Sequence, residues 1–314
     1  MANYLVTGGA GFIGSALVRL LISEGHKVTV FDSLATGRLE NLAELEGGHT
    51  FVKGDIRDSN LLLETFAENA YECVFHLAAL PSVQLSFADP QLTHWVNATG
   101  TLNVLAAARA VGVPRVVFAS SCAVYGNAEE VPAIESASPE PLSPYAADKL
   151  LGEHYCKLYT HELGVPAVAL RLFNVYGPRQ NPSTEYAAVV PNFLTRLLGG
   201  EAPVIYGTGK QTRDFIFVED AARAFALAAA SPKAPGRVIN IGSGIETSIN
   251  KLAAKAIKVA SVEIEPEHGP ARQGEVTRSR ADITLAGKVL GFEPKTALLE
   301  GLATTYEHFK HGVP

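Results

Sequence analysis

The sequence TGGAGFIG occupies residues Thr7–Gly14 and separates two segments of different periodicity. Before it, Asn3–Thr7 reads as a short buried strand, and after it a helical apolar pattern runs on to Gly25. Lys27–Phe31 then reads as a second apolar strand. A glycine-rich turn between a strand and a helix, followed by another strand, predicts a β-α-β unit whose turn can approach a phosphate group closely.

Three glycines of this turn, Gly8, Gly11 and Gly14, have the spacing GxxGxxG. They permit a tight turn and let the backbone and the helix N-terminus reach a pyrophosphate. Asp32 closes the second strand, near the ~20-residue spacing typical of a carboxylate that binds the ribose of a dinucleotide. Because this carboxylate would repel a 2′-phosphate, the pattern favours NAD over NADP. A glycine motif alone is weak evidence for dinucleotide binding. The evidence here is stronger because the motif stands in a strand–turn–helix–strand–acid order.

Strand-like and helical segments continue to alternate, which predicts an α/β fold with a doubly wound parallel sheet (a Rossmann fold). Further strands are expected at His49–Lys53, Cys73–Leu77, Arg115–Ala119 and Ala167–Arg171. The helices between them are expected at Leu61–Phe66, Gln91–Val111 and Tyr145–Leu163. Ligands bind beyond the carboxyl ends of such strands, and polar or small residues fall there five times: Gly8, Asp32, Asp55, Ala78 and Ser120–Ser121.

The pattern changes after residue 172, where Pro, Gly and short elements interrupt it. We expect loops at Tyr206–Asp214 and Gly269–Asp282, and a helix and a strand that return to the sheet at Val218–Ala229 and Arg237–Ile241. The expected organisation is an NAD-binding Rossmann domain and a smaller interleaved C-terminal substrate-binding lobe. The domain covers residues 1–172, with 214–245 returning to it, and the lobe covers 173–213 and 246–314.

Composition excludes several classes of function. The formal net charge of −6 provides no basic surface for nucleic acid. The three cysteines match no metal-ligand spacing, so no metal site is expected, and reduced thiols fit a cytoplasmic protein. We expect no signal peptide, and no apolar run approaches the ~18 residues of a membrane span.

Tyr145 and Lys149 are four residues apart at the start of an expected helix, so they share one helical face. A phenol has an unperturbed pKa of about 10, and a neighbouring cation favours its ionised form. Taken alone, this spacing is more often a pair of surface residues on an amphipathic helix. A functional pair is better supported here because Ser121 is expected at the same edge of the sheet.

Together these motifs resemble the extended short-chain dehydrogenase/reductases, and within them most of all the UDP-hexose 4-epimerases that act on UDP-N-acetylglucosamine. The resemblance covers essentially the whole chain. It rests on Thr7–Gly14, Asp55, Ser121-x-x-x-Tyr125-Gly126, Tyr145-x-x-x-Lys149, Arg213–Phe215 and Val218–Asp220. It implies an NAD-dependent isomerase in which tightly bound NAD takes a hydride from the sugar 4-position. A transient 4-keto sugar then turns over and receives the hydride on its other face.

The same resemblance implies roles for individual residues. Tyr145 would be the base for the 4-hydroxyl, Lys149 would lower its pKa and hold the nicotinamide ribose, and Ser121 would shuttle the proton. The cofactor-binding residues would be Gly8, Gly11, Phe12, Ile13, Gly14, Asp32, Asp55, Ile56, Leu77, Ala78, Ala79, Asn97, Ser120, Tyr145 and Lys149. The substrate-binding residues would be Ser82, Ser121, Asn174, Ala188, Val189, Tyr206, Arg213, Arg272, Glu275 and Ser279.

Within the substrate set, Arg213 and Arg272 match the family's diphosphate-binding arginines. Asn174 would contact the diphosphate and sugar, Tyr206 would pack near the uracil, and Glu275 would accept a hydrogen bond from the uridine ribose.

The choice of sugar depends on volume. Relatives restricted to glucose and galactose carry a bulky tyrosine where this chain has Ser279, and a small residue leaves space for a 2-N-acetyl group. Gln180–Pro191 also resembles relatives that prefer N-acetylated sugars, whereas Pro81, beside Ser82, departs from their pattern. We therefore expect UDP-GlcNAc/UDP-GalNAc 4-epimerisation with possible UDP-Glc/UDP-Gal activity. A dehydratase is disfavoured because Cys122–Val124 carries no carboxylate.

Three alternatives stay open. Within enzymes, the chain could be a UDP-glucose 4-epimerase only, or a UDP-glucuronate 4-epimerase, although relatives of the latter tend to have threonine in place of Asn174. Outside enzymes, it could be an NAD-sensing binding protein, but such proteins generally lack the Tyr/Lys pair. The resemblance also implies a homodimer through a four-helix bundle, built from Gln91–Val111 and Tyr145–Leu163 of each subunit.

Overall fold

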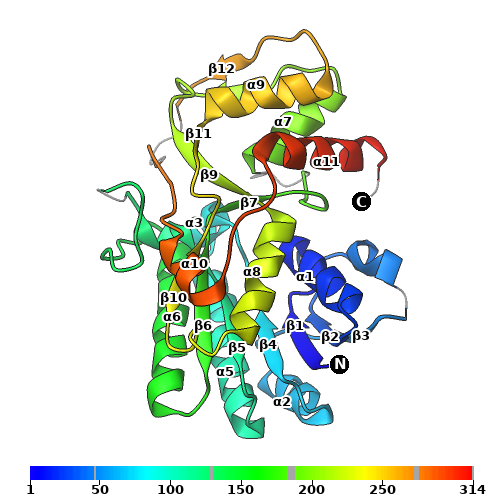
Figure 1. Cartoon of the computed structure of the whole chain (residues 1–314), viewed down its shortest axis with the longest axis vertical. Helices are drawn as coiled ribbons and strands as arrows, with labels where there is room; N and C mark the ends of the chain where they lie inside the picture. The colour runs from blue at the N-terminus through cyan, green and yellow to red at the C-terminus, as the bar shows by residue number, and fades with distance from the viewer. Residues whose placement is uncertain (46, 128–129, 183–187, 272–275, 313–314) are drawn as a thin grey trace.

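A seven-stranded parallel sheet forms the centre of the computed structural model, which describes residues 1–314 except 46, 128–129, 183–187, 272–275 and 313–314 (Figure 1). Its strands lie in the order β10-β6-β5-β4-β1-β2-β3. Their bounds are β1 Asn3–Thr7, β2 Lys27–Asp32, β3 His49–Lys53, β4 Cys73–His76, β5 Val116–Ser121, β6 Ala167–Leu172 and β10 Val238–Ile241. The order reverses direction at β1, and the predicted Rossmann-type α/β fold is confirmed.

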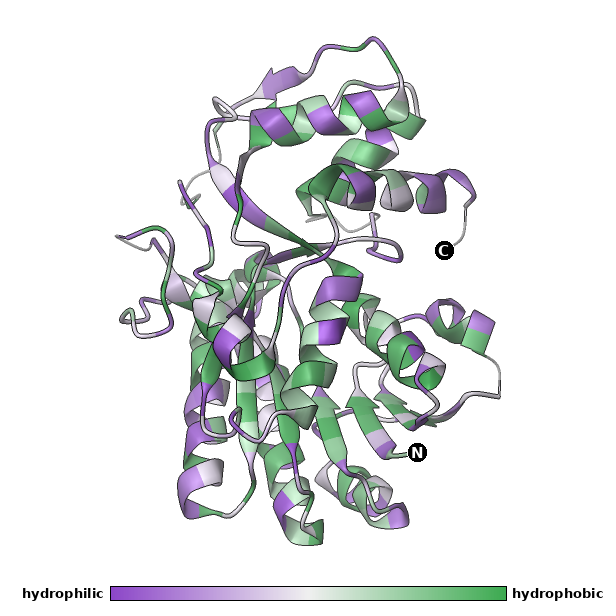
Figure 2. Cartoon of the chain, viewed as in Figure 1, coloured by the Kyte–Doolittle hydropathy of each residue, from purple (hydrophilic) through white to green (hydrophobic). Residues whose placement is uncertain are grey.

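Helices cover both faces of this sheet (Figure 1). On one face lie α1 (Phe12–Ser23) and α8 (Val218–Ala230), and on the other lie α2 (Ser59–Glu68), α5 (Gly100–Val111) and α6 (Pro144–Glu162). Successive strand side chains alternate between the two cores, because a strand has a period of two. In β1, for example, Val6 belongs to the first core and Leu5 to the second. Figure 2 shows the sheet strands coloured mostly as hydrophobic, as expected for strands buried on both faces.

The predicted long helix Gln91–Val111 is a continuous helical run with an irregular centre. It consists of α4 (Pro90–His94), a five-residue π-helical segment η2 (Trp95–Thr99) and α5. Within η2, the Asn97 side chain accepts a hydrogen bond from Leu80 N (2.8 Å) and donates one to Leu80 O (3.0 Å). The apolar pattern of the sequence indicates neither this irregular segment nor the bonds of Asn97 to Leu80, because the two residues lie in different chain segments.

Two smaller sheets lie beyond the carboxyl end of the large one (Figure 1). The first contains β11 (Glu246–Ser248), β9 (Thr212–Phe217) and β7 (Asn174–Tyr176), and the second pairs β12 (Glu267–Gly269) with β8 (Val204–Tyr206). Helices α7 (Val189–Leu198), α9 (Ile249–Ala260) and α11 (Leu298–Lys310) pack around a separate apolar core. The predicted loop Tyr206–Asp214 is wrong at both ends, because β8 ends at Tyr206 and β9 already begins at Thr212.

The two parts of the chain are interleaved. After β9, α8 packs against α1 and β10 joins the large sheet beside β6. Later, α10 (Thr284–Leu290) returns to the same region, where Ala286 and Leu290 belong to the core under the sheet. The exact domain boundaries stay a prediction.

The short elements that connect the parts are η1 (Leu39–Leu45), α3 (Val83–Ala88) and η3 (Cys122–Tyr125). Across the part of the chain that the structure describes, no helix is long and apolar enough to cross a membrane.

Candidate active site

The glycine turn joins β1 to α1 at the reversal point of the sheet. Gly8 has φ +73°, and a Cβ atom placed on it would lie 2.6 Å from Ala78 N, so only glycine fits. A Cβ on Gly14 would overlap the carbonyl oxygen of Gly8. Gly11 is the N-cap of α1, and within the described residues no side chain caps this helix. The first N–H groups of α1 therefore form an open cradle that suits a pyrophosphate.

Asp32 ends β2 beside this turn and is buried. Its carboxylate accepts hydrogen bonds from Ala10 N (3.0 Å) and Leu34 N (2.8 Å). Burial raises the pKa of Asp32, while these two backbone hydrogen bonds act to lower it. A fixed carboxylate next to an uncapped helix N-terminus suits the adenosine ribose of NAD, so the residues present fit this cofactor.

The other predicted cofactor residues follow the neighbouring strands. Asp55 accepts two hydrogen bonds from the Arg57 side chain (3.0 and 2.7 Å), which lowers its pKa, and Arg57 lies 5.0 Å from the Trp95 ring centroid. Ile56 is buried, and Leu77, Ala78 and Ala79 directly follow β4. Phe12 and Ile13 form the first turn of α1. Asn97 instead clamps the Leu80 backbone, so its contact with the cofactor stays a prediction.

Tyr145 and Lys149 lie in the first two turns of α6. The helix starts here because Ser143 caps it, accepting a hydrogen bond from Ala146 N (3.1 Å), and Pro144 occupies the first helical position. Tyr145 is 9% exposed and Lys149 5% exposed. The Lys149 ammonium donates to Ala119 O (2.8 Å) of β5 and lies 5.9 Å from the Tyr145 ring centroid.

The Ser121 hydroxyl, at the end of β5, lies close enough to the Tyr145 phenol to act on its pKa. It accepts a hydrogen bond from Ala123 N (3.2 Å), which fixes its position. Burial raises the pKa of Tyr145 to about 12, and the Ser121 hydroxyl opposes this rise. Burial lowers the pKa of Lys149 to about 8, against the attraction of the Asp148 carboxylate. The structure thus brings all three predicted catalytic residues together, with the phenol protonated at neutral pH.

The sequence did not predict the buried polar side chains that lie close to the catalytic residues. His76 of β4 bonds Thr7 Oγ1 through Nδ1 (2.8 Å) and Thr101 Oγ1 through Nε2 (2.9 Å). Burial, with the nearby Lys149 charge, lowers the pKa of His76 to about 3, so its ring is neutral. Glu153, one helical turn past Lys149, is also buried. The sequence signal for Glu153 was its spacing, because a polar residue four positions after Lys149 lies on the same helical face as Tyr145 and Lys149.

Three predicted substrate residues gather near Ser121. Ser279 and Arg213 both lie near the Cys122 thiol and act to lower its pKa, which burial raises. Arg213 donates to Thr212 O (2.8 Å) and Val276 O (2.7 Å), and Asn174 donates to Asp214 O (3.1 Å).

The remaining predicted substrate residues are more dispersed. Ser82 caps α3 through a hydrogen bond from Leu85 N (3.1 Å), and Ala188 and Val189 begin α7. Tyr206 ends β8 with 38% of its surface exposed. Arg272 and Glu275 lie outside the described residues.

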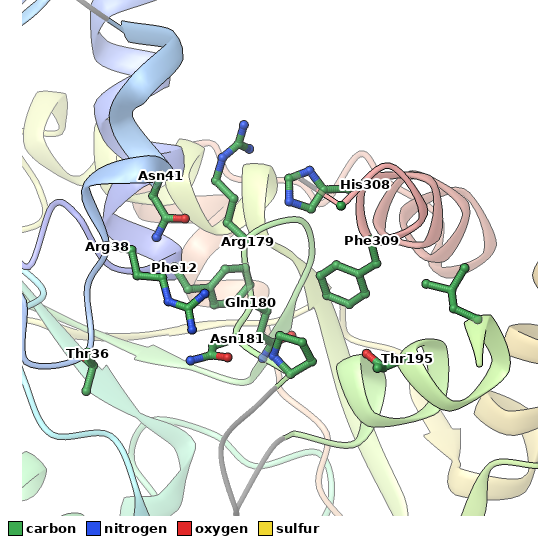
Figure 3. A pocket seen from close by; sticks show the side chains of 13 residues that line it. Phe12, Thr36, Arg38, Asn41, Arg179, Gln180, Asn181, Thr195, His308 and Phe309 are labelled. Carbon is green, nitrogen blue, oxygen red and sulfur yellow. The ribbon is translucent and has the colours of Figure 1, made fainter. Parts of the chain in front are cut away.

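A cavity of about 250 Å³ lies beside the glycine turn and extends toward α11 (Figure 3). Phe12, Arg38, Arg179 and His308 are among its lining residues. Ser121, Tyr145 and Lys149 do not line it, so this cavity does not mark the catalytic centre. Among the described residues, no three or more His, Cys, Asp or Glu side chains form a group that could hold a metal ion.

Comparison with known proteins agrees with this geometry. Residues 4–242 match the model of the family described as "NAD dependent epimerase/dehydratase family". A UDP-glucose 4-epimerase of Mycolicibacterium smegmatis is 44% identical over 310 residues, covering 98% of each chain. The UDP-N-acetylglucosamine 4-epimerase of Methanobrevibacter ruminantium, solved with UDP-N-acetylmuramic acid, has a TM-score of 0.95 at 39% identity and covers 99% of each chain.

A UDP-glucose 4-epimerase of Thermotoga maritima, solved with UDP-glucose, is similar to the same extent. Its TM-score is 0.94 at 39% identity, covering 99% of this chain and 100% of that one. These likenesses extend over nearly the full length and agree with the fit of NAD to the glycine turn and Asp32. The chain therefore belongs to the NAD-dependent epimerase/dehydratase family, and the resemblance to its UDP-hexose 4-epimerase group is confirmed.

Proposed function

We propose that this protein reversibly converts UDP-GlcNAc and UDP-GalNAc through a transient 4-keto sugar, with additional activity on UDP-Glc and UDP-Gal. One observation carries the proposal. The Tyr145 phenol, with the Ser121 hydroxyl beside it and the buried Lys149 ammonium near its ring, stands at the sheet edge that also carries the glycine turn. Proton transfer and cofactor binding thus belong to one edge.

When bound, NAD supplies reversible hydride exchange with the sugar 4-position. The chain's own residues transfer the proton: Tyr145 receives it from the 4-hydroxyl, and the neighbouring Ser121 hydroxyl relays it. A phenol whose pKa is near 12 is a poor base at neutral pH. We propose that Lys149 and the positive charge of the oxidised cofactor together lower this pKa.

The sugar preference follows from Ser279. Its side chain lies near Cys122, the residue after Ser121, so position 279 borders the segment that would meet the sugar. A serine there leaves volume that a 2-N-acetyl group can fill. Arg213 is the nearby described cation for the diphosphate, and we propose that Arg272, Glu275, Asn174 and Tyr206 complete the nucleotide site.

The test is incubation of the purified protein with UDP-GlcNAc without added NAD, followed by chromatographic detection of UDP-GalNAc. The same assay is run with UDP-Glc and UDP-glucuronate, and a parallel set receives added NAD to restore any cofactor lost in purification. Fastest turnover of UDP-GlcNAc supports the proposal. Turnover of UDP-Glc alone or of UDP-glucuronate alone assigns the corresponding alternative, and no product in either set indicates an NAD-binding sensor.

We further propose a homodimer through a four-helix bundle built from the α4–η2–α5 run and α6. These helices pack on each other, and they expose large apolar side chains: Trp95, Val111 and Leu158. Sedimentation at several concentrations would measure the assembly, and a monomer throughout would contradict it. We propose the cytoplasm as location, since the three thiols are unpaired.

A further inference from the structure

Glu153 lies on the same face of α6 as the catalytic pair. Tyr145, Lys149 and Glu153 follow one another at intervals of four residues, so their side chains form a row that faces the sheet. Glu153 is 2% exposed, and its carboxylate accepts three hydrogen bonds. Ser120 Oγ (2.5 Å) and Arg171 Nε (2.8 Å) donate to one oxygen, and Arg171 Nη2 (2.7 Å) donates to the other.

Arg171, on β6, extends this contact across the sheet. It is 3% exposed, and its guanidinium lies 4.5 Å from the ring centroid of Tyr125 in η3. The Tyr125 hydroxyl donates to Asn240 Oδ1 (2.7 Å) of β10. One buried chain of contacts therefore joins α6 to β5, β6, η3 and β10, and its Ser120 member directly precedes Ser121.

Stability alone does not account for this ion pair. Two buried charges lose their hydration, and well-packed apolar residues of similar volume often serve stability equally well or better. What the pair adds is geometry, because a bidentate arginine–carboxylate contact fixes both distance and orientation. An apolar contact would tolerate sliding of α6 over the sheet. Proton transfer between Ser121 and Tyr145 does not tolerate such sliding, since small misplacements of reacting groups reduce rates strongly.

We propose that Glu153, Arg171 and Ser120 are positioning residues that hold α6 in register with β5, so that Tyr145 and Lys149 meet Ser121 correctly. The proposal rests on the proposed epimerase function, because it assumes that this trio transfers the proton. It predicts that loss of the pair reduces turnover more than substrate affinity, because neither Glu153 nor Arg171 is among the residues proposed to bind the sugar.

The main test variant is the double substitution Glu153→Met/Arg171→Met. It removes both charges together, so it leaves no uncompensated buried charge, and its thermal midpoint is expected at or above that of the wild type. We expect kcat to fall about 30-fold or more, in the range of lost positioning effects, with KM for the UDP-sugar changed less than threefold. Arg223→Met on α8 removes the arginine from another ion pair with a buried carboxylate, Asp220, whose charge the N–H groups of Lys295 and Thr296 still stabilise. This control should leave kcat unchanged.

A second readout does not depend on turnover. In protein labelled with 3-fluorotyrosine, the ¹⁹F resonance of Tyr145 is identified by its absence in Tyr145→Phe. This resonance should shift and broaden in the double variant and stay in place in Arg223→Met. A folded double variant with wild-type kcat and an unchanged resonance overturns the positioning role. If the wild type converts no UDP-sugar but the resonance still moves, the positioning inference stands and the epimerase proposal fails.

Discussion

The junction of α6 with β5 and the substrate side around β9 differ in how far their polar groups are buried. At the junction, Lys149 bonds a backbone carbonyl, Glu153 is saturated by Arg171 and Ser120, and Tyr145 lies beside Ser121. Tyr145, Lys149 and Glu153 are all buried. On the substrate side, Tyr206 is substantially exposed, and Asn174, Arg213 and Ser279 are partly exposed.

Burial indicates which property each region should control. The junction is organised before any ligand arrives, because its partners are side chains and carbonyls of the protein itself. Its geometry should therefore determine how fast every sugar reacts. The substrate side is partly open to solvent, so its residues can contact a bound sugar and should determine which sugar is accepted.

The largest expected effect comes from breaking the junction at its phenol. Tyr145→Phe removes the proposed base, and we expect kcat to fall about 10³-fold for every accepted sugar, within the range of general acid–base catalysis. Stopped-product assays with each UDP-sugar measure this loss. Tyr155→Phe, on the same helix, is the control and should react normally. A Tyr145→Phe protein with full activity on any sugar would end the assignment of this region as the catalytic centre.

A substitution on the substrate side should instead change selectivity. Ser279→Tyr fills the volume proposed for the N-acetyl group, and overpacking typically costs about 1–3 kcal/mol, or roughly 10- to 100-fold in rate. We expect kcat/KM for UDP-GlcNAc to fall to that extent, while UDP-Glc changes only a few-fold. Ser279→Ala, which keeps the site small, should preserve both activities. Equal losses for both sugars in the tyrosine variant would remove the steric basis of the comparison.

The two regions also differ in how well sequence predicts them. β1, its glycine turn and β2 carry strong local signals, and the strand β1 was predicted with its observed bounds. Tyr145 and Lys149 were found because helical spacing alone places them together. The proximity of Ser279 to Cys122 was not predicted, because no sequence pattern links two residues so far apart in the chain.

Other features escaped prediction for physical reasons. The π-helical segment η2 contains Asn97, whose side chain bonds the Leu80 backbone, and no local pattern encodes a contact between two chain segments. Strand β8 is short, and β9 begins shortly after a glycine-containing turn, so the turn signals concealed the ends of both strands. Glutamate usually lies at the surface and histidine is intermediate in burial, so only the tertiary structure shows the buried partners of Glu153 and His76.

The pH dependence of stability tests whether the buried junction is as closed as its contacts indicate. His76 has its pKa lowered to about 3 in the folded protein, whereas an unfolded histidine titrates near 6.5. Below pH 6.5 the unfolded chain therefore binds a proton that the folded chain does not, so stability is lost as pH falls. The slope from this one residue approaches about 1.4 kcal/mol per pH unit.

His76→Gln removes this titration, so the unfolding free energy of wild type minus variant should shrink by roughly 1 kcal/mol between pH 7 and 5.5. Urea unfolding at four pH values measures the difference, and the subtraction cancels the other titrating groups. A difference that is independent of pH would mean that His76 accepts a proton in the folded state. The region around Thr7, Thr101 and Lys149 would then be open to water.

The smallest expected effect concerns Ser82, which belongs to neither region clearly. It caps α3 through Leu85 N, yet the family resemblance also gives it a contact with the sugar. Ser82→Ala should lower the unfolding free energy by about 1 kcal/mol if the cap dominates, while Ser82→Asp, which can still cap, should not. Thermal unfolding and KM for UDP-GlcNAc are measured on both. Stability loss in the alanine variant alone, with KM unchanged in both, assigns Ser82 to the scaffold. A higher KM in both variants with unchanged stability assigns it to the substrate side, because aspartate keeps the cap but alters the group offered to the sugar.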